Sequence, residues 1–189
     1  MTLANGHRHL AIPGPTNMPD EVLNALHHAS VDIYGGSSEV ASRACMKDLR
    51  KVFRTKGNIY IYAANGHGAW EAALTNTLSK GDKVLVLESG LFPIVWGENA
   101  GKLGIDTEVL GERPGRAVDL QAVTARLARD TDHEFKAILM VQADTATGVV
   151  NDVRGVRAAL DETGHPALLM VDTIASLACM EFDMDAWGV

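Results

Sequence analysis

Short runs of consecutive apolar residues alternate along the chain with longer segments in which apolar residues recur at helical spacing. The runs, rich in Val, Ile, Leu and Tyr, predict strands at 58–64, 83–88, 107–110, 137–142 and 167–171. The spaced segments predict helices at 21–26, 39–55, 69–78, 94–103, 119–128 and 153–163. Continuous apolar strands that alternate with helices are typical of a sheet buried on both faces. The pattern therefore predicts a three-layer α/β fold with a mostly parallel sheet and helices on both faces.

The first twenty residues do not fit this alternation. Pro13, Pro15 and Pro19 remove backbone donors and fix φ, so residues 1–20 are predicted to form an extended N-terminal arm. Residues 21–189 then form the α/β domain. No apolar run approaches the roughly 20 residues of a membrane span, and the first nine residues have no apolar core like that of a secretory signal.

Composition narrows the function classes. The formal net charge of -7 argues against nucleic acid or an anionic membrane as the main partner, because both need a cationic surface. The two cysteines, Cys45 and Cys179, are too few and too far apart for a disulfide framework or a metal site. We expect each to be a small buried hydrophobic residue in a cytoplasmic protein that holds no metal.

In parallel sheets ligands bind at the carboxyl ends of the strands, so the residues that follow each strand deserve most weight. Asn65-Gly66-His67-Gly68 follows the first predicted strand and precedes a helix. Two glycines allow close backbone approach, and a helix start offers free N–H groups, which is an arrangement typical of a phosphate site. A plain tight turn is the alternative. A dinucleotide fingerprint is disfavoured because Glu71 stands where its third glycine belongs.

Three later strand ends carry further candidates. Phe92, after the second strand, could lie over a flat ring, or could simply pack in the core. Thr145 belongs to a hydroxyl-rich segment that suits a polar site wall or a helix cap. Asp172 ends the last strand, where a carboxylate is costly unless it is paired. A protonated pyridine nitrogen would be a suitable partner, whereas a helix start or a distant arginine is the alternative.

Together these segments resemble the class V family of aminotransferases that depend on pyridoxal phosphate, in its serine–glyoxylate and alanine–glyoxylate branch. The matching stretches are Pro13 to Asn17, Asn65 to Asn76, Lys80 to Leu85, Thr145 to Val149 and Val171 to Leu177. The resemblance implies the large domain of fold type I, a homodimer, and transfer of an amino group from a small amino acid such as serine or alanine to a 2-oxo acid, glyoxylate or pyruvate.

The resemblance also implies a role for each candidate. Backbone N–H groups of Gly66 and His67, with Asn65 alongside, would bind the cofactor phosphate. Phe92 would stack on the pyridine ring, and Thr145 would bond to the ring hydroxyl.

Two further roles follow from the same resemblance. Asp172 would pair with the ring nitrogen, and the loop near Gly14 would line the site of the substrate carboxylate. The segment 34–37, Tyr-Gly-Gly-Ser, commonly reads His-Arg-Ser in relatives, and this departure leaves the substrate preference open.

The lysine that such enzymes use to form a Schiff base would follow Val189, as would their C-terminal small domain. The lysines of this chain all precede Asp172: Lys47, Lys51, Lys56, Lys80, Lys83, Lys102 and Lys136. We therefore expect residues 21–189 to be the N-terminal part of the cofactor-binding domain, with a sheet that is incomplete at its C-terminus, and the 189-residue chain to be inactive alone.

Three other functions remain open at this stage. A non-catalytic fragment or binding module would explain the missing lysine directly. A cysteine desulfurase or lyase could share the scaffold, although Phe92 stands where desulfurases of this kind carry a histidine. A nucleotide-binding domain would bind NAD or ATP and not pyridoxal phosphate.

Overall fold

The computed structural model describes residues 9–111 and 115–189, and the chain divides into two compact units, 1–45 and 46–189. The first unit contains α1 (Asp20–Leu26) and the beginning of α2 (Gly36–Phe53). No residue of either helix is buried. The second unit contains the sheet and all the elements that surround it.

The sheet consists, within the described residues, of four parallel strands in the order β2-β1-β3-β4. Their bounds are β1 Lys83–Leu87, β2 Asp106–Leu110, β3 Phe135–Val141 and β4 Leu168–Asp172. The predicted parallel α/β arrangement is confirmed. All four strands point the same way, so the segments that follow them lie along one edge of the sheet.

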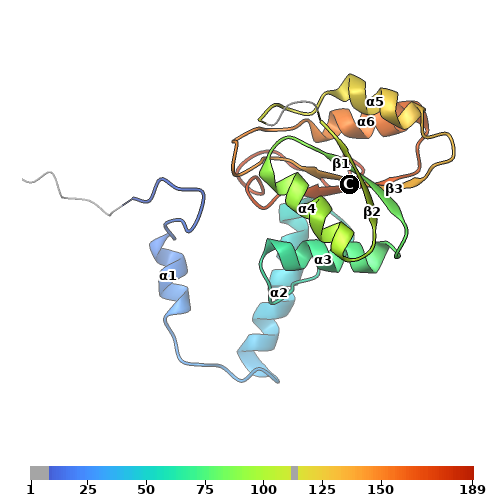
Figure 1. Cartoon of the computed structure of the whole chain (residues 1–189). Helices are drawn as coiled ribbons and strands as arrows, with labels where there is room; N and C mark the ends of the chain where they lie inside the picture. The colour runs from blue at the N-terminus through green and yellow to red at the C-terminus, as the bar shows by residue number, and fades with distance from the viewer. Residues whose placement is uncertain (1–8, 112–114) are drawn as a thin grey trace, which may run out of the picture. The chain divides into compact units, whose positions relative to one another are not determined.

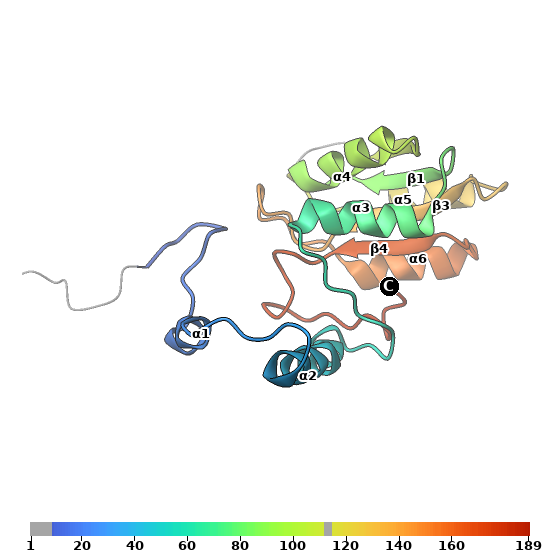
Figure 2. The ribbon, with the colours of Figure 1, turned by 90° about the horizontal axis from the view of Figure 1, so that it is seen from below.

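Four helices cover this sheet, two on each face (Figures 1 and 2). They are α3 (Gly66–Thr77) and α4 (Leu91–Lys102) on one face, and α5 (Leu120–Ala128) and α6 (Val153–Thr163) on the other. β1 illustrates why both faces need cover: Val84 and Val86 pack toward α3 and α4, whereas Leu85 and Leu87 pack toward α5 and α6. Side chains of a strand alternate between faces, so a fully apolar strand needs a helix layer on each side.

The strand predicted at 58–64 is absent, and this prediction was wrong. The segment runs from α2 to α3 without pairing to any described strand, and Tyr60 and Ile61 are 71% and 66% exposed. β-forming residues make a strand only where a neighbouring backbone supplies ladder hydrogen bonds. The only backbone bond recorded between described residues of the segment joins the N–H of Ala64 to the carbonyl of Tyr62.

A side-chain cap and a glycine mark the ends of two helices. The Asp119 side chain accepts hydrogen bonds from Gln121 N and Ala122 N at the start of α5. Gly104 follows α4 with a φ of +80°, a conformation that favours glycine. The expectation of buried cysteines was wrong, because Cys45 and Cys179 are both free and exposed. Cys45 belongs to α2, whose side chains are all at least partly accessible.

Candidate functional site

The start of α3 forms a turn that leaves backbone donors free. Asn65 caps the helix, and its Oδ1 accepts a hydrogen bond from Gly68 N at 3.2 Å. A Cβ placed on Gly68 would lie 2.5 Å from the Cβ of Ala64, so the turn requires glycine there. The N–H groups of Gly66 and His67 donate to no other described residue. Two free donors at a positive helix end suit an anion such as phosphate.

Asp172 lies at the carboxyl end of β4 and is 8% exposed. Each of its carboxylate oxygens accepts one hydrogen bond: Oδ2 from the indole Nε1 of Trp70 at 2.9 Å, and Oδ1 from the backbone N of Ile174 at 2.7 Å. The sequence predicted that this carboxylate needs a partner. Both partners in the structure are neutral, so the charge itself has no counter-ion among the described residues.

The pKa of Asp172 is raised above its usual value. Burial is the largest cause, because it disfavours the charged carboxylate. The hydrogen bonds from Ile174 and Trp70 and the proximity of His67 act in the opposite direction, whereas the neighbouring Asp144 raises the pKa further. A cationic ligand atom next to this group would stabilise its charged form.

Phe92 lies in the first turn of α4, directly behind the loop that follows β1. Its backbone N donates to Asp144 Oδ2 at 2.9 Å, and this contact caps α4 because the N-cap residue, Gly90, has no side chain to do so. A Cβ on Gly90 would lie 2.4 Å from the Asp144 carboxyl, so glycine is required for this approach. The Phe92 ring is partly buried, and its centroid is 6.4 Å from that of Trp70.

Thr145 lies in the turn after β3 and is half-buried. The turn is held by the buried Asp144, whose Oδ1 accepts hydrogen bonds from Ala146 N and Thr147 N at 3.0 and 2.9 Å. Within the described residues, the Thr145 side chain has no hydrogen-bond partner. A hydroxyl that is positioned by its turn but free of protein partners can bond to a ligand.

Gly14 belongs to the first compact unit, and it is exposed with a φ of +144°. Its role at a substrate carboxylate stays a prediction. The other candidates, Asn65, Gly66, His67, Phe92, Thr145 and Asp172, all belong to the second unit.

Direct contacts bring most of these candidates together. His67, Trp70 and Phe92 form a chain of aromatic contacts, with Asp172 bonded to Trp70. The site is therefore built from four segments that meet at one edge of the sheet.

Sequence reasoning missed two residues of the site, Trp70 and Asp144. Trp70 follows Gly66 by one helical turn, a spacing that could have indicated a side chain directed at the sheet below the turn. Asp144 reads as an ordinary loop residue, and no sequence signal connects it to the start of α4, 52 positions away.

Metal-ligand clusters and membrane-spanning helices were sought in the described part of the chain. Among residues 9–111 and 115–189, no group of three or more His, Cys, Asp or Glu side chains could hold a metal ion. In the same part of the chain, no helix is long and apolar enough to cross a membrane.

Comparison with known proteins yields relatives along nearly the whole chain. A serine–glyoxylate aminotransferase of Hyphomicrobium methylovorum is 42% identical over 182 residues, which cover 96% of this chain and 45% of that protein. The serine–glyoxylate aminotransferase of Arabidopsis thaliana is 38% identical over 185 residues, covering 97% and 46%. The chain thus spans a little under half the length of these relatives.

Solved structures show the same fold. An alanine–glyoxylate aminotransferase from Nostoc sp. superposes with a TM-score of 0.86 at 28% identity, over 100% of this chain and 50% of that one. An aspartate aminotransferase from Thermus thermophilus gives a TM-score of 0.86 at 26% identity, over 94% and 49%. The sequence matches the family described as aminotransferase class V over residues 9–189, and the chain therefore belongs to that family.

Proposed function

We propose that this chain is the cofactor-holding part of an aminotransferase that moves an amino group from a small amino acid, such as serine or alanine, to glyoxylate or pyruvate. One observation carries the proposal. Free backbone donors at the start of α3 and the buried carboxylate of Asp172 are connected through a single side chain, Trp70. The names of the relatives support the choice of substrates.

The cofactor of class V aminotransferases is pyridoxal phosphate, and the residues present fit it. When bound, its protonated pyridine ring withdraws electrons from the carbon that loses a proton. The N–H groups of Gly66 and His67 would bind the phosphate, with Asn65 fixing the turn. Phe92 would cover the ring, and Thr145 would donate to or accept from the ring hydroxyl.

Asp172 would hold the proton at the ring nitrogen. Its carboxylate is buried and raised in pKa, and among the described residues it is bonded to neutral donors alone, so a protonated nitrogen would supply a counter-charge. In turn, the carboxylate would keep the nitrogen protonated at neutral pH. The position of Asp172 suits it to this role as the partner of a protonated ring nitrogen.

We also propose that the 189-residue chain does not transfer amino groups alone, because the lysines of the sheet strands and of α4 lie away from the candidate site. Lys83 begins β1, at the opposite edge of the sheet, where Nζ pairs with Glu108 and Glu134 at 3.1 and 3.3 Å. Lys136 is the second residue of β3, at the same edge, and Lys102 ends α4. A lysine must reach the aldehyde carbon to react there.

Cofactor binding by the purified chain tests the first part of the proposal. Pyridoxal phosphate should cause a saturable change in tryptophan fluorescence, compete with inorganic phosphate, and bind far more weakly to Asp172→Ala. Borohydride treatment should then attach no cofactor to any single lysine in stoichiometric amount. Absence of binding would contradict the cofactor assignment, and a stoichiometric adduct would contradict the reading of the lysines.

Amino transfer is tested in a chimera in which residues 9–189 replace the matching part of the Hyphomicrobium methylovorum relative. The chimera should form glycine from glyoxylate with serine or alanine as donor, and the same chimera with Asp172→Ala should not. A chimera that binds the cofactor but transfers nothing from either donor would refute the proposed activity.

A homodimer in the cytoplasm completes the proposal. The first unit exposes several large apolar side chains, among them Ile33 at 73% and Tyr34 at 91%. Contact with a second copy would remove such groups from water. Sedimentation measurements on the chain, compared with an Ile33→Asp, Tyr34→Ser variant, check this: the wild type should be the larger species.

A further inference from the structure

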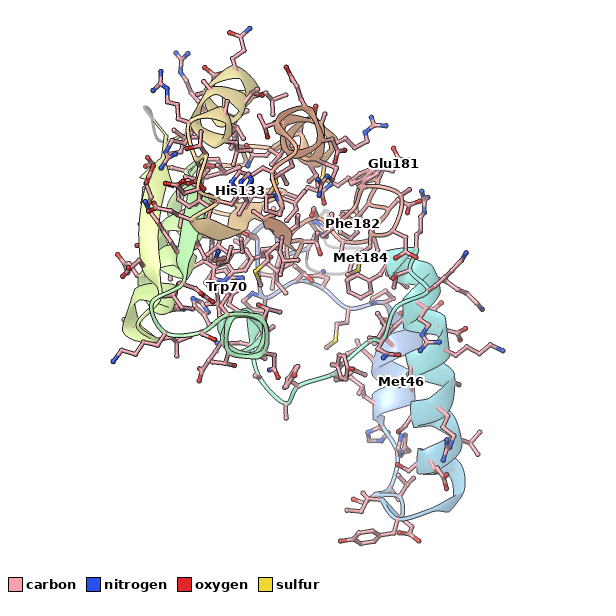
Figure 3. All side chains as sticks on the ribbon, turned by 90° about the vertical axis from the view of Figure 1, so that its right-hand side faces the viewer. Met46, Trp70, His133, Glu181, Phe182 and Met184 are labelled. Carbon is pink, nitrogen blue, oxygen red and sulfur yellow. The ribbon has the colours of Figure 1, made fainter. Side chains whose placement is uncertain are left out.

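Trp70 contacts more of the candidate site than any residue the sequence singled out. It is 6% exposed and stacks on Trp96, with ring centroids 5.4 Å apart and planes 10° apart. Its ring also makes edge-on contacts with the rings of His67 and Phe92, whose centroids lie 4.7 and 6.4 Å from its own. Figure 3 labels Trp70 between α3 and the sheet, in the apolar layer that these elements share.

The position of Trp70 along α3 links the two ends of the site. It lies one helical turn after Gly66, whose free N–H belongs to the phosphate turn, and its own indole N–H donates to Asp172, 102 residues away. The indole is planar, its side chain has two rotatable bonds, and stacking fixes both, so the distance from its Cα to its N–H is constant. The distance between the turn and the carboxylate is therefore set through this side chain.

We propose that Trp70 is a positioning residue, whose indole N–H holds the Asp172 carboxylate at the separation from the phosphate turn that one cofactor molecule needs. The inference rests on the proposed function and deepens it. Phosphate alone needs only the turn, whereas a phosphorylated pyridine needs the turn and the carboxylate at once. Loss of the indole N–H should thus weaken the second ligand selectively.

The neighbouring Trp96 provides a matched control. It stacks on Trp70 and is 2% exposed, but its buried Nε1 has no hydrogen-bond partner among the described residues. Replacement by phenylalanine removes a bonded donor at position 70 and an unbonded donor at position 96. Both changes keep an aromatic ring in the stack, so they differ chiefly in the bond to Asp172.

The groups that face Asp172 define the expected pH effect. They are the ring of His67 and the carboxylate of Asp144, besides the two bonded donors of Trp70 and Ile174. Trp70→Phe leaves Oδ2 without its partner and so moves the pKa of Asp172 further upward. Ligands that need the ionised carboxylate should then bind well only at a higher pH than in the wild type.

The experiment measures binding of two probes, inorganic phosphate and pyridoxamine 5′-phosphate, across a pH series. The second probe lacks the aldehyde, so no lysine reacts with it. For Trp70→Phe we expect about tenfold weaker binding of pyridoxamine phosphate, the size of one charge-assisted hydrogen bond. The acid limb of its pH profile should move upward, and phosphate affinity should stay within about twofold, since the turn is untouched.

Two further variants complete the test. Trp96→Phe should behave as the wild type with both probes. In an Asp172→Asn background, Trp70→Phe should cause little additional loss, because the group through which it acts is already changed. A rise in pH should restore binding of the Trp70→Phe single variant but not of Asp172→Asn.

Several results would overturn the inference. Equal losses for phosphate and pyridoxamine phosphate in Trp70→Phe would indicate a general disturbance of α3. An unchanged pH profile, or the same loss in Trp96→Phe, would indicate packing without positioning. The proposed function itself would fail if the wild type bound neither probe, or if Asp172→Asn bound both as the wild type does. These outcomes differ from those that refute only the role of Trp70.

Discussion

The buried pair of Asp130 and His165 offers a sharp test of what stabilises this fold. Both side chains lie at the amino ends of β3 and β4, away from the candidate site, and they are 4% and 1% exposed. Asp130 accepts hydrogen bonds from Glu134 N, Phe135 N and His165 Nε2 at 3.1, 2.9 and 3.0 Å. Ala167 N donates to Nδ1 of the same ring, so Nε2 carries the hydrogen.

Asp130→Ala removes the acceptor for all three donors. Two of them, Phe135 N and His165 Nε2, belong to residues that are 1% and 3% exposed, so water cannot replace the carboxylate. A buried donor left unpaired costs about 1–3 kcal/mol, and two therefore cost about 2–6 kcal/mol together. We expect the free energy of unfolding to fall by about 4 kcal/mol, the middle of this 2–6 kcal/mol range. Such a loss is easily measurable because domains of this kind are stable by only about 5–15 kcal/mol.

Urea unfolding followed by tryptophan fluorescence measures this loss, with the slope checked for two-state behaviour. Asp130→Asn keeps one acceptor oxygen and should lose less than Asp130→Ala. Asp132→Ala is the matched control, since Asp132 is exposed two positions away and should change stability by less than about 0.5 kcal/mol. Equal stability of the alanine variants at 130 and 132 would refute the reasoning.

The pH dependence supplies an independent check on the same carboxylate. Burial alone would raise the pKa of Asp130, but the donors from Phe135, His165 and Glu134 together lower it below the usual aspartate value of 3.8. A group whose pKa is lowered on folding stabilises the protein above its unfolded pKa, and the stabilisation is lost as pH falls through the folded value. The difference in unfolding free energy between the wild type and Asp130→Asn should therefore become smaller as the pH falls below about 3.8.

Two further predictions concern the phosphate turn and a half-buried ion pair. In Gly68→Ala the added Cβ would overlap Ala64, so the variant should be less stable by about 1–3 kcal/mol and should bind phosphate more weakly. Gly101→Ala is the control, because its Cβ would lie in open space and should have neither effect. Calorimetry measures the stability and titration with phosphate measures the binding. The hydrogen bond from Arg126 lowers the pKa of Glu108 and outweighs burial, which acts in the opposite direction. Above pH 4.5, Glu108→Gln should therefore be less stable than the wild type, and the difference in unfolding free energy should shrink in acid. A difference that does not change with pH would contradict this.

Most of the helices and strands could be predicted from the amino-acid sequence alone. Apolar runs gave the four strands of the sheet, and helical spacing gave the helices, because side-chain periodicity is a local property. The glycines of the turn and the carboxylate at the end of β4 were likewise visible, since each follows directly from its place beside an element. Parallel strands bring the segments that follow β1, β3 and β4 to one edge, which is why this part of the candidate site was predictable in outline.

The contacts that connect these residues depend on long-range packing. The bond from Trp70 to Asp172 spans 102 positions, and the Asp144 cap on α4 spans 52, so neither leaves a local pattern in the sequence. The failed strand at 58–64 has the same cause: a strand depends on a partner backbone, and no neighbouring residue reports whether that partner is present. Local sequence therefore indicates which groups reach the sheet edge, whereas long-range packing determines which of them hold one another in place.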